Sequence, residues 1–143
     1  MAPEYYGLEM FAQAAPAGAR LLKLSGSLGN VKAWATRAPG GTVHVVLINE
    51  YTAQPRTVAV RIPGVHGRAM LERLQARGVS ARTGVTLGGQ TYGNATTTGT
   101  LSGRSAITPV RRTNGAYVVR LPQASAAMLT IDAATAGVMT PPF

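Results

Sequence analysis

The stretch TVHVVLINEYTAQPRTVAVRI, residues 42–62, decides the fold because it holds two strand-like segments joined by a polar turn. In its second half, Val58, Val60 and Ile62 alternate with residues that are polar or small, which is typical of a strand buried on one face. The first half, residues 43–48, is apolar on both faces, so both faces are expected to be covered. We therefore predict that residues 43–48 form the central strand of a sheet.

Similar segments lie on both sides of this stretch, separated by short turns rich in glycine and proline. They are ARLLKLS (19–25), VKAWATRA (31–38), GRAMLERLQA (67–76), GAYVVRLP (115–122) and AAMLTID (126–132). A polar stretch rich in glycine and threonine, residues 78–104, interrupts the pattern. In the last two segments, alternation predicts that six side chains point inward: Tyr117, Val119, Leu121, Ala127, Leu129 and Ile131.

The chain opens differently, on MAPEYYGLEMFAQAAP, whose apolar residues recur near the helical period. Pro3 suits the first turn of a helix, and Pro16 followed by Gly18 ends it. The prediction is a mainly β protein, an antiparallel β-sandwich of about eight strands preceded by one N-terminal helix. Residues 1–17 are assigned to the helix and residues 18–143 to the sandwich domain.

Charge and composition exclude several classes of protein. The chain carries 14 Lys and Arg against 5 Asp and Glu, a net charge of +9, yet the basic residues are scattered and only Arg111 and Arg112 are adjacent. No basic helix or aromatic ladder accompanies them, so no specific nucleic-acid partner is expected. No apolar run is long enough to span a membrane, and with no cysteine there is no thiolate metal site and no cysteine nucleophile.

The chemistry-bearing residues form no catalytic motif. The five acidic residues stand apart, and a glycosidase needs two carboxylates at a fixed separation across the sugar. Glu50 is expected to be a loop carboxylate or the partner of an arginine, and Glu72 a solvent-facing residue paired across strands. His44 is expected to be structural and His66 lies in a turn, so neither predicts a metal site or cofactor. The chain alone is not expected to be an enzyme.

Three features could still bind a partner. Trp34 is either a core residue or a platform for a sugar ring, and Gln90 and Tyr92 lie in a GGQTYG loop that is either a tight turn or a polar contact surface. The helix has apolar residues on more than one side and is expected to pack against another body. Its candidate packing residues are Tyr5, Tyr6, Leu8 and Phe11.

The order of these parts resembles the C-terminal β-domain of glycoside hydrolase family 79, the β-glucuronidase and heparanase-like group. The resemblance covers nearly the whole chain, and its most specific pieces are the YYGL-x-x-F helix, VVLINE, GVTLGGQ and the ending ASAAMLTI. It implies that the helix is the last one of a (β/α)₈ barrel and that the strands form a sandwich packed beside it. The acid/base and nucleophile glutamates of that family belong to the barrel, and no glutamate of this chain matches them.

Two main hypotheses follow. In the first, the chain is the non-catalytic sandwich of a family 79 hydrolase and works by packing on a catalytic barrel domain or chain. In the second, it is a free-standing carbohydrate-binding module for acidic polysaccharide, which needs an exposed aromatic platform at Trp34 or Tyr92. A basic nucleic-acid binder is the third reading. The N-terminus lacks the pattern of a secretory signal, while the resemblance implies a secreted or periplasmic protein.

Overall fold

The structure is a computed structural model that describes residues 3–26, 29–62, 64–65, 67–76, 80–82, 84–91, 101 and 103–132, with only the backbone of residues 3–5. Within this part, one helix precedes ten strands, which confirms the mainly β prediction. Two of the ten, β6 and β8, are only two residues long, which accounts for the excess over about eight. The elements are α1 (Pro3–Ala14), β1 (Arg20–Leu22), β2 (Val31–Arg37), β3 (Val43–Asn49), β4 (Arg56–Val60), β5 (Ala69–Gln75), β6 (Thr86–Leu87), β7 (Thr108–Val110), β8 (Arg112–Thr113), β9 (Ala116–Leu121) and β10 (Ser125–Ile131).

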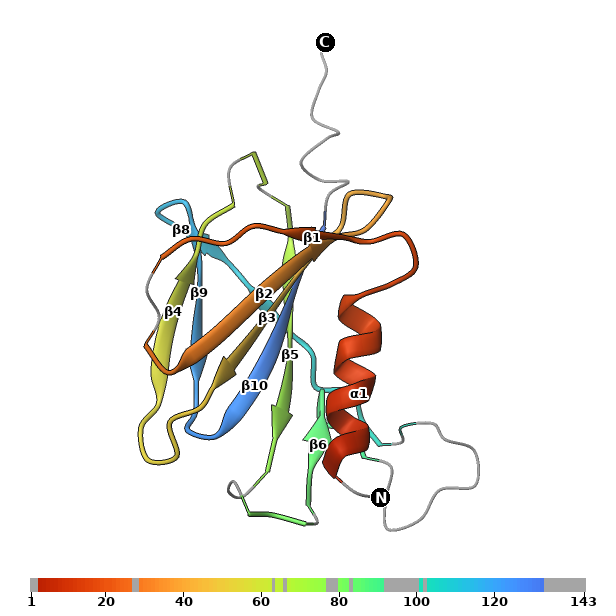
Figure 1. The fold of residues 1–143 in the computed structure, drawn as a ribbon, viewed down its shortest axis with the longest axis vertical. Helices are drawn as coiled ribbons and strands as arrows, with labels where there is room; N and C mark the ends of the chain where they lie inside the picture. The colour runs from red at the N-terminus through yellow and green to blue at the C-terminus, as the bar shows by residue number, and fades with distance from the viewer. Residues whose placement is uncertain are drawn as a thin grey trace.

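The strands form two antiparallel sheets. The larger sheet has the order β1-β2-β3-β10-β5-β6, with β7 also paired to β5, and the smaller sheet has the order β4-β9-β8. Strand β3 lies between β2 and β10, so the prediction of a central strand at residues 43–48 is confirmed. Figure 1 shows the smaller sheet on one side of the larger sheet and helix α1 on the other. The helix therefore makes a third layer against the outer face of the larger sheet, the face turned away from the smaller sheet.

The main core fills the space between the two sheets. All six side chains that alternation placed inward are buried there, and β4 adds Val58 from the smaller sheet. The phenol of Tyr117 donates a hydrogen bond to the carbonyl of Gly67 at 2.7 Å, which satisfies its buried hydroxyl. Asn49 is also buried, and its side-chain amide donates to the carbonyls of Gln54, Leu121 and Pro122. These bonds tie the end of β3 to the end of β9.

A second core lies between helix α1 and the outer face of the larger sheet. Tyr6, Met10 and Ala14 recur every four residues, so they share one helix face, and all three are buried. They pack with Val46 of β3 and Met128 of β10, among other residues. The helix thus covers part of its own sheet. The described helix is too short to cross a membrane.

Glu72 does not face solvent as its position in the strand had suggested. It pairs with Met128 across β5 and β10, and cross-strand partners share a face, so Glu72 points to the helix side of the sheet. Its side chain is only 8% exposed. The prediction was wrong because the outer face of this sheet is covered by α1, whereas a solvated face had been assumed.

Candidate docking surface

Helix α1 is apolar on two sides, and its own sheet buries only one of them. Leu8 is 63% exposed and Phe11 is 57% exposed, while Tyr6 and Met10 of the same helix are buried. The exposed side of the helix therefore offers apolar surface to a second body.

Trp34 lies beside this exposed helix side. It belongs to β2, is half-buried and packs against the helix-side core. Its ring stands 5.6 Å from that of Phe11, centroid to centroid, with 51° between the two planes. Aromatic pairs favour such tilted arrangements. Phe11 consequently covers part of the face that a sugar-binding tryptophan would need to present.

Leu21 extends the apolar surface onto the edge of the sheet. It pairs with Thr36, which is two residues from Trp34 on the same face, so Leu21 and Trp34 are diagonal neighbours. Leu21 is 75% exposed. The sequence offered a signal that was not used: Leu21 and Leu22 are adjacent in a strand and must point to opposite faces. We call the set Leu8, Phe11, Leu21 and Trp34 the docking surface.

The other predicted packing residues lie elsewhere. Tyr6 is on the buried side of the helix, where its hydroxyl lies 2.8 Å from the hydroxyl of Thr91. The side chain of Tyr5 and the whole of Tyr92 lie outside the described residues. The fold thus joins Phe11 with Trp34, leaves Leu8 exposed on the same helix and places Tyr6 in the interior.

Gln90 closes a tight turn after β6. Its backbone exchanges two hydrogen bonds with Leu87, and the intervening Gly88 and Gly89 both have positive φ. The side-chain amide donates to the carbonyl of Gly103 at 3.0 Å. The amide donor of Gln90 therefore holds two loop segments together. This matches the interpretation of the loop as a tight turn.

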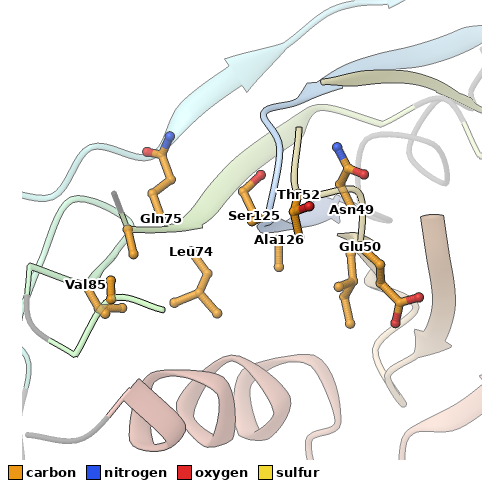
Figure 2. A pocket seen from close by; sticks show the side chains of 12 residues that line it. Asn49, Glu50, Thr52, Leu74, Gln75, Val85, Ser125 and Ala126 are labelled. Atoms are coloured by element: carbon orange, nitrogen blue, oxygen red, sulfur yellow. The ribbon is translucent and has the colours of Figure 1, made fainter. Parts of the chain in front are cut away.

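A pocket of about 450 Å³ opens where β3 and β5 end and β10 begins. Figure 2 shows Leu74, Val85 and Ala126 on its apolar side, with helix α1 running beyond them, and Glu50 and Gln75 at its margins. Asn49 and Ser125 also line it, but each donates its hydrogen bonds to backbone carbonyls. Among the described residues that line the pocket there is no aromatic side chain, and Glu50 is the single carboxylate. These residues thus supply neither the ring platform nor the carboxylate pair of a sugar-hydrolysing site.

The fold brings Glu9 of the helix close enough to Glu72 to repel it electrostatically. Burial raises the pKa of Glu72 above its usual value, and the charge of Glu9 raises it further. The Oε1 atom of Glu72 is buried without a hydrogen-bond partner. This carboxylate lies under α1, so the two glutamates do not flank a space that a sugar could enter.

His44 of the central strand contacts a neighbouring strand of the sheet. Nδ1 of His44 lies 3.3 Å from the hydroxyl of Thr130 across the β3–β10 ladder. Partial burial lowers the pKa of His44, because a charged imidazole would lose solvation. His66 lies outside the described residues. Within the part of the chain that the structure describes, no three acidic or histidine side chains come together as a metal site would require.

Comparison with known proteins identifies relatives of this fold. A family model, the glycosyl hydrolase family 79 C-terminal beta domain, matches residues 30–128. Among solved structures, a 4-O-α-L-rhamnosyl-β-D-glucuronidase from Fusarium oxysporum 12S superimposes with a TM-score of 0.68 at 22% identity, covering 85% of this chain and 28% of that one. A GH30 endoxylanase from Clostridium papyrosolvens C71 gives a TM-score of 0.59 at 16% identity, covering 89% of this chain and 27% of that one. No curated protein sequence matches significantly.

These structural likenesses concern the fold, since identity is low in each. A GH30 xylanase C catalytic domain from Talaromyces cellulolyticus gives a similar result, with a TM-score of 0.58, 16% identity, and coverage of 89% of this chain and 23% of that one. In all three comparisons the chain spans less than a third of the length of its structural neighbour.

Proposed function

The chain belongs to the glycosyl hydrolase family 79 C-terminal beta domains, and from this premise we propose that it is the non-catalytic accessory sandwich of a retaining, β-glucuronidase or heparanase-like hydrolase. In this role it supports a separate (β/α)₈ catalytic domain. Residues 1–17 correspond to the last helix of that barrel, and residues 18–143 form the accessory domain. The activity on β-linked glucuronides belongs to the assembled enzyme.

The exposed apolar side of α1 is the observation that carries this proposal. Leu8 and Phe11 are more than half exposed although the same helix is already seated on its own sheet. Burying a fully exposed side chain of this kind is worth about 1.5–3 kcal/mol, and these two are little more than half exposed, so a partner that covers both gains about 2–4 kcal/mol. Leu21 and the free edge of Trp34 extend the same surface. A helix that packs on the sandwich with one face and on a barrel with the other accounts for both apolar sides.

The placement of the carboxylates supports a non-catalytic role. Glu72 and Glu9 lie in the helix–sheet interface, and Glu50 stands alone at the margin of the pocket. A retaining glycosidase needs two carboxyl groups about 5–5.5 Å apart on either side of an open sugar site. In this proposal both of them come from the barrel.

The test is capture of the catalytic barrel encoded in the same gene or beside it. The full chain is immobilised, the barrel is added, and the bound fraction is titrated. We expect saturable 1:1 capture, weakened at least about tenfold by Leu8→Asp combined with Phe11→Asp, since about 1.4 kcal/mol corresponds to a factor of ten.

The matched control is Val118→Asp. Val118 is another exposed apolar residue, 47% exposed, but it lies on β9 of the smaller sheet, away from α1. It introduces one negative charge at a distant surface, against two in the docking-surface variant. Equal loss of capture in the control and the docking-surface variant would sink the assignment of this surface. Absence of capture by the unaltered chain would sink the accessory function itself.

The alternative is a free-standing carbohydrate-binding module for acidic polysaccharide. The net charge of +9 favours it, because a basic surface attracts polyanions. Against it, Phe11 covers part of Trp34, and the amide donor of Gln90 is engaged. The emission of Trp34, the single tryptophan, separates the two readings. A platform tryptophan shifts its emission when sugar is added, whereas one in a docking surface responds to the barrel.

A further inference from the structure

A second surface of the chain is a groove of about 650 Å³ at the opposite edge of the larger sheet from β1. Two segments line it, residues 67–70 at the start of β5 and residues 109–112 along β7 and β8. Three of its eight lining residues are arginines, all exposed, namely Arg68, Arg111 and Arg112.

The strand register explains why these arginines meet. Ala69 of β5 pairs with Val110 of β7, and Arg68 and Arg111 are the residues next to this pair, each just outside its strand. Arg112 begins β8 and pairs with Tyr117, which places it at the same end of the sandwich. The fold thus brings three arginines from two parts of the chain to one groove.

The backbone around the groove is held in place. The N–H of Asp132 donates to the carbonyl of Arg68 at 2.8 Å, and the phenol of Tyr117 donates to the carbonyl of Gly67 at 2.7 Å. A Cβ atom on Gly67 would lie 1.6 Å from the carbonyl oxygen of Asp132, so only glycine fits this contact. Arg112 is close enough to Tyr117 to offset part of the rise in its pKa that burial causes. The arginine backbones are therefore preorganised.

The residues that line the groove carry positive charge. Three of the eight described residues have a guanidinium group, and none of these eight has a carboxylate. Guanidinium groups bind planar or tetrahedral oxyanions through paired N–H donors, and such charge-assisted bonds are among the stronger ones in proteins. A groove lined by three such groups therefore suits an oxyanion.

We propose that this groove binds the oxyanion groups, carboxylate or sulfate, of an acidic glycan. The oxyanion chemistry follows from the three arginines, whereas the choice of a glycan as its carrier rests on the proposed function. The site lies on β5, β7 and β8, while the docking surface lies on α1, β1 and β2, so a chain seated on a barrel could still hold a glycan at this edge.

Equilibrium binding of the full chain to three polyanions at low salt tests the proposal. The probes are hyaluronan, which carries carboxylates only, dextran sulfate, which carries sulfates only, and single-stranded DNA of matched charge. The site variant combines Arg68→Gln, Arg111→Gln and Arg112→Gln. We expect it to weaken binding of at least one glycan by about tenfold or more, the loss of one charge-assisted hydrogen bond. Weaker binding of hyaluronan would indicate carboxylate recognition, and weaker binding of dextran sulfate would indicate sulfate recognition.

The control variant combines Arg20→Gln, Arg82→Gln and Arg104→Gln, which are exposed arginines that do not line the groove, and removes the same charge. If both triple variants weakened glycan binding equally, the binding would reflect general attraction by net charge. That result would overturn the proposal of a specific site. Failure of the unaltered chain to bind either glycan, or tighter groove-dependent binding of DNA, would also overturn it. Capture of the barrel is measured separately, so failure of the proposed function is distinguishable from failure of the groove.

Discussion

Phe11 and Trp34 join helix α1 to strand β2 through a tilted aromatic contact with 5.6 Å between ring centroids. Phe11 remains 57% exposed in this arrangement, so the contact leaves more than half of its side chain to solvent. The same pair therefore holds the helix on the sheet and forms the centre of the docking surface. Changes at these two residues should affect both stability and partner binding.

Replacing Phe11 by alanine should destabilise the fold modestly and expose Trp34. Loss of the aromatic pair costs about 0.5–1.5 kcal/mol, to which the lost burial adds. The emission of Trp34 should shift to longer wavelength because its ring becomes more hydrated. Urea unfolding followed by far-UV circular dichroism and by fluorescence measures both effects. Leu8→Ala is the control, since Leu8 is 63% exposed and an exposed site of this kind usually changes stability by less than about 0.5 kcal/mol. An unchanged emission spectrum in Phe11→Ala would contradict the contact.

Glu72 should make stability fall as pH rises. Burial raises its pKa in the folded chain above the usual 4.5, with the charge of Glu9 adding to the rise, so the folded state holds the proton more tightly than the unfolded state. The stabilisation is fully present below about pH 4.5 and is lost as pH rises through the raised pKa. Glu72→Gln, which imitates the protonated form, should remove this loss and be the more stable protein at pH 7.

Urea midpoints measured from pH 4 to pH 8 check the role of Glu72. The control is Glu50→Gln, which removes one carboxylate at an exposed position on the pocket margin, away from helix α1. If Glu72→Gln keeps the full slope of the unaltered chain, the buried carboxyl does not cause it.

The alternation of side chains along the strands could be predicted, because a period of two reports which residues face the core. The inward residues of β4, β9 and β10 were all predicted this way. The burial of Glu72 could not be predicted, because periodicity does not reveal what covers the outer face of a sheet. The apolar Val46 and Met128 on that face were a signal that something does.

The role of the helix was predicted only in part for a similar reason. A helical period shows that α1 has apolar sides, but not which one its own sheet will cover. In the structure, Tyr6 and Met10 are buried against the sheet, whereas Leu8 and Phe11 are exposed. The arginine groove went unseen because it depends on register, and Arg68 and Arg111 are far apart in the sequence.

Gly67→Ala should destabilise the chain strongly. The new methyl group would lie 1.6 Å from the carbonyl oxygen of Asp132, and backbone atoms cannot yield without separating β5 from the end of β10. Overpacking of this kind typically costs about 1–3 kcal/mol, and more where backbone must move. Thermal unfolding measures the loss. Gly40→Ala is the control, because a Cβ at Gly40 meets nothing within 4 Å. Equal melting temperatures of the two variants would contradict the contact.

The chain without a partner should self-associate through the docking surface. Leu8, Phe11 and Leu21 are each more than half exposed, and covering the exposed part of two such side chains gains about 2–4 kcal/mol of apolar transfer free energy. Sedimentation velocity over a range of concentrations should show weak association that Leu8→Asp combined with Phe11→Asp weakens at least about tenfold, because each carboxylate would have to be desolvated in the contact. Val118→Asp, on the smaller sheet, should leave association unchanged. If the control abolishes association equally, the contact lies on another face and α1 is not what the chain presents to its partner.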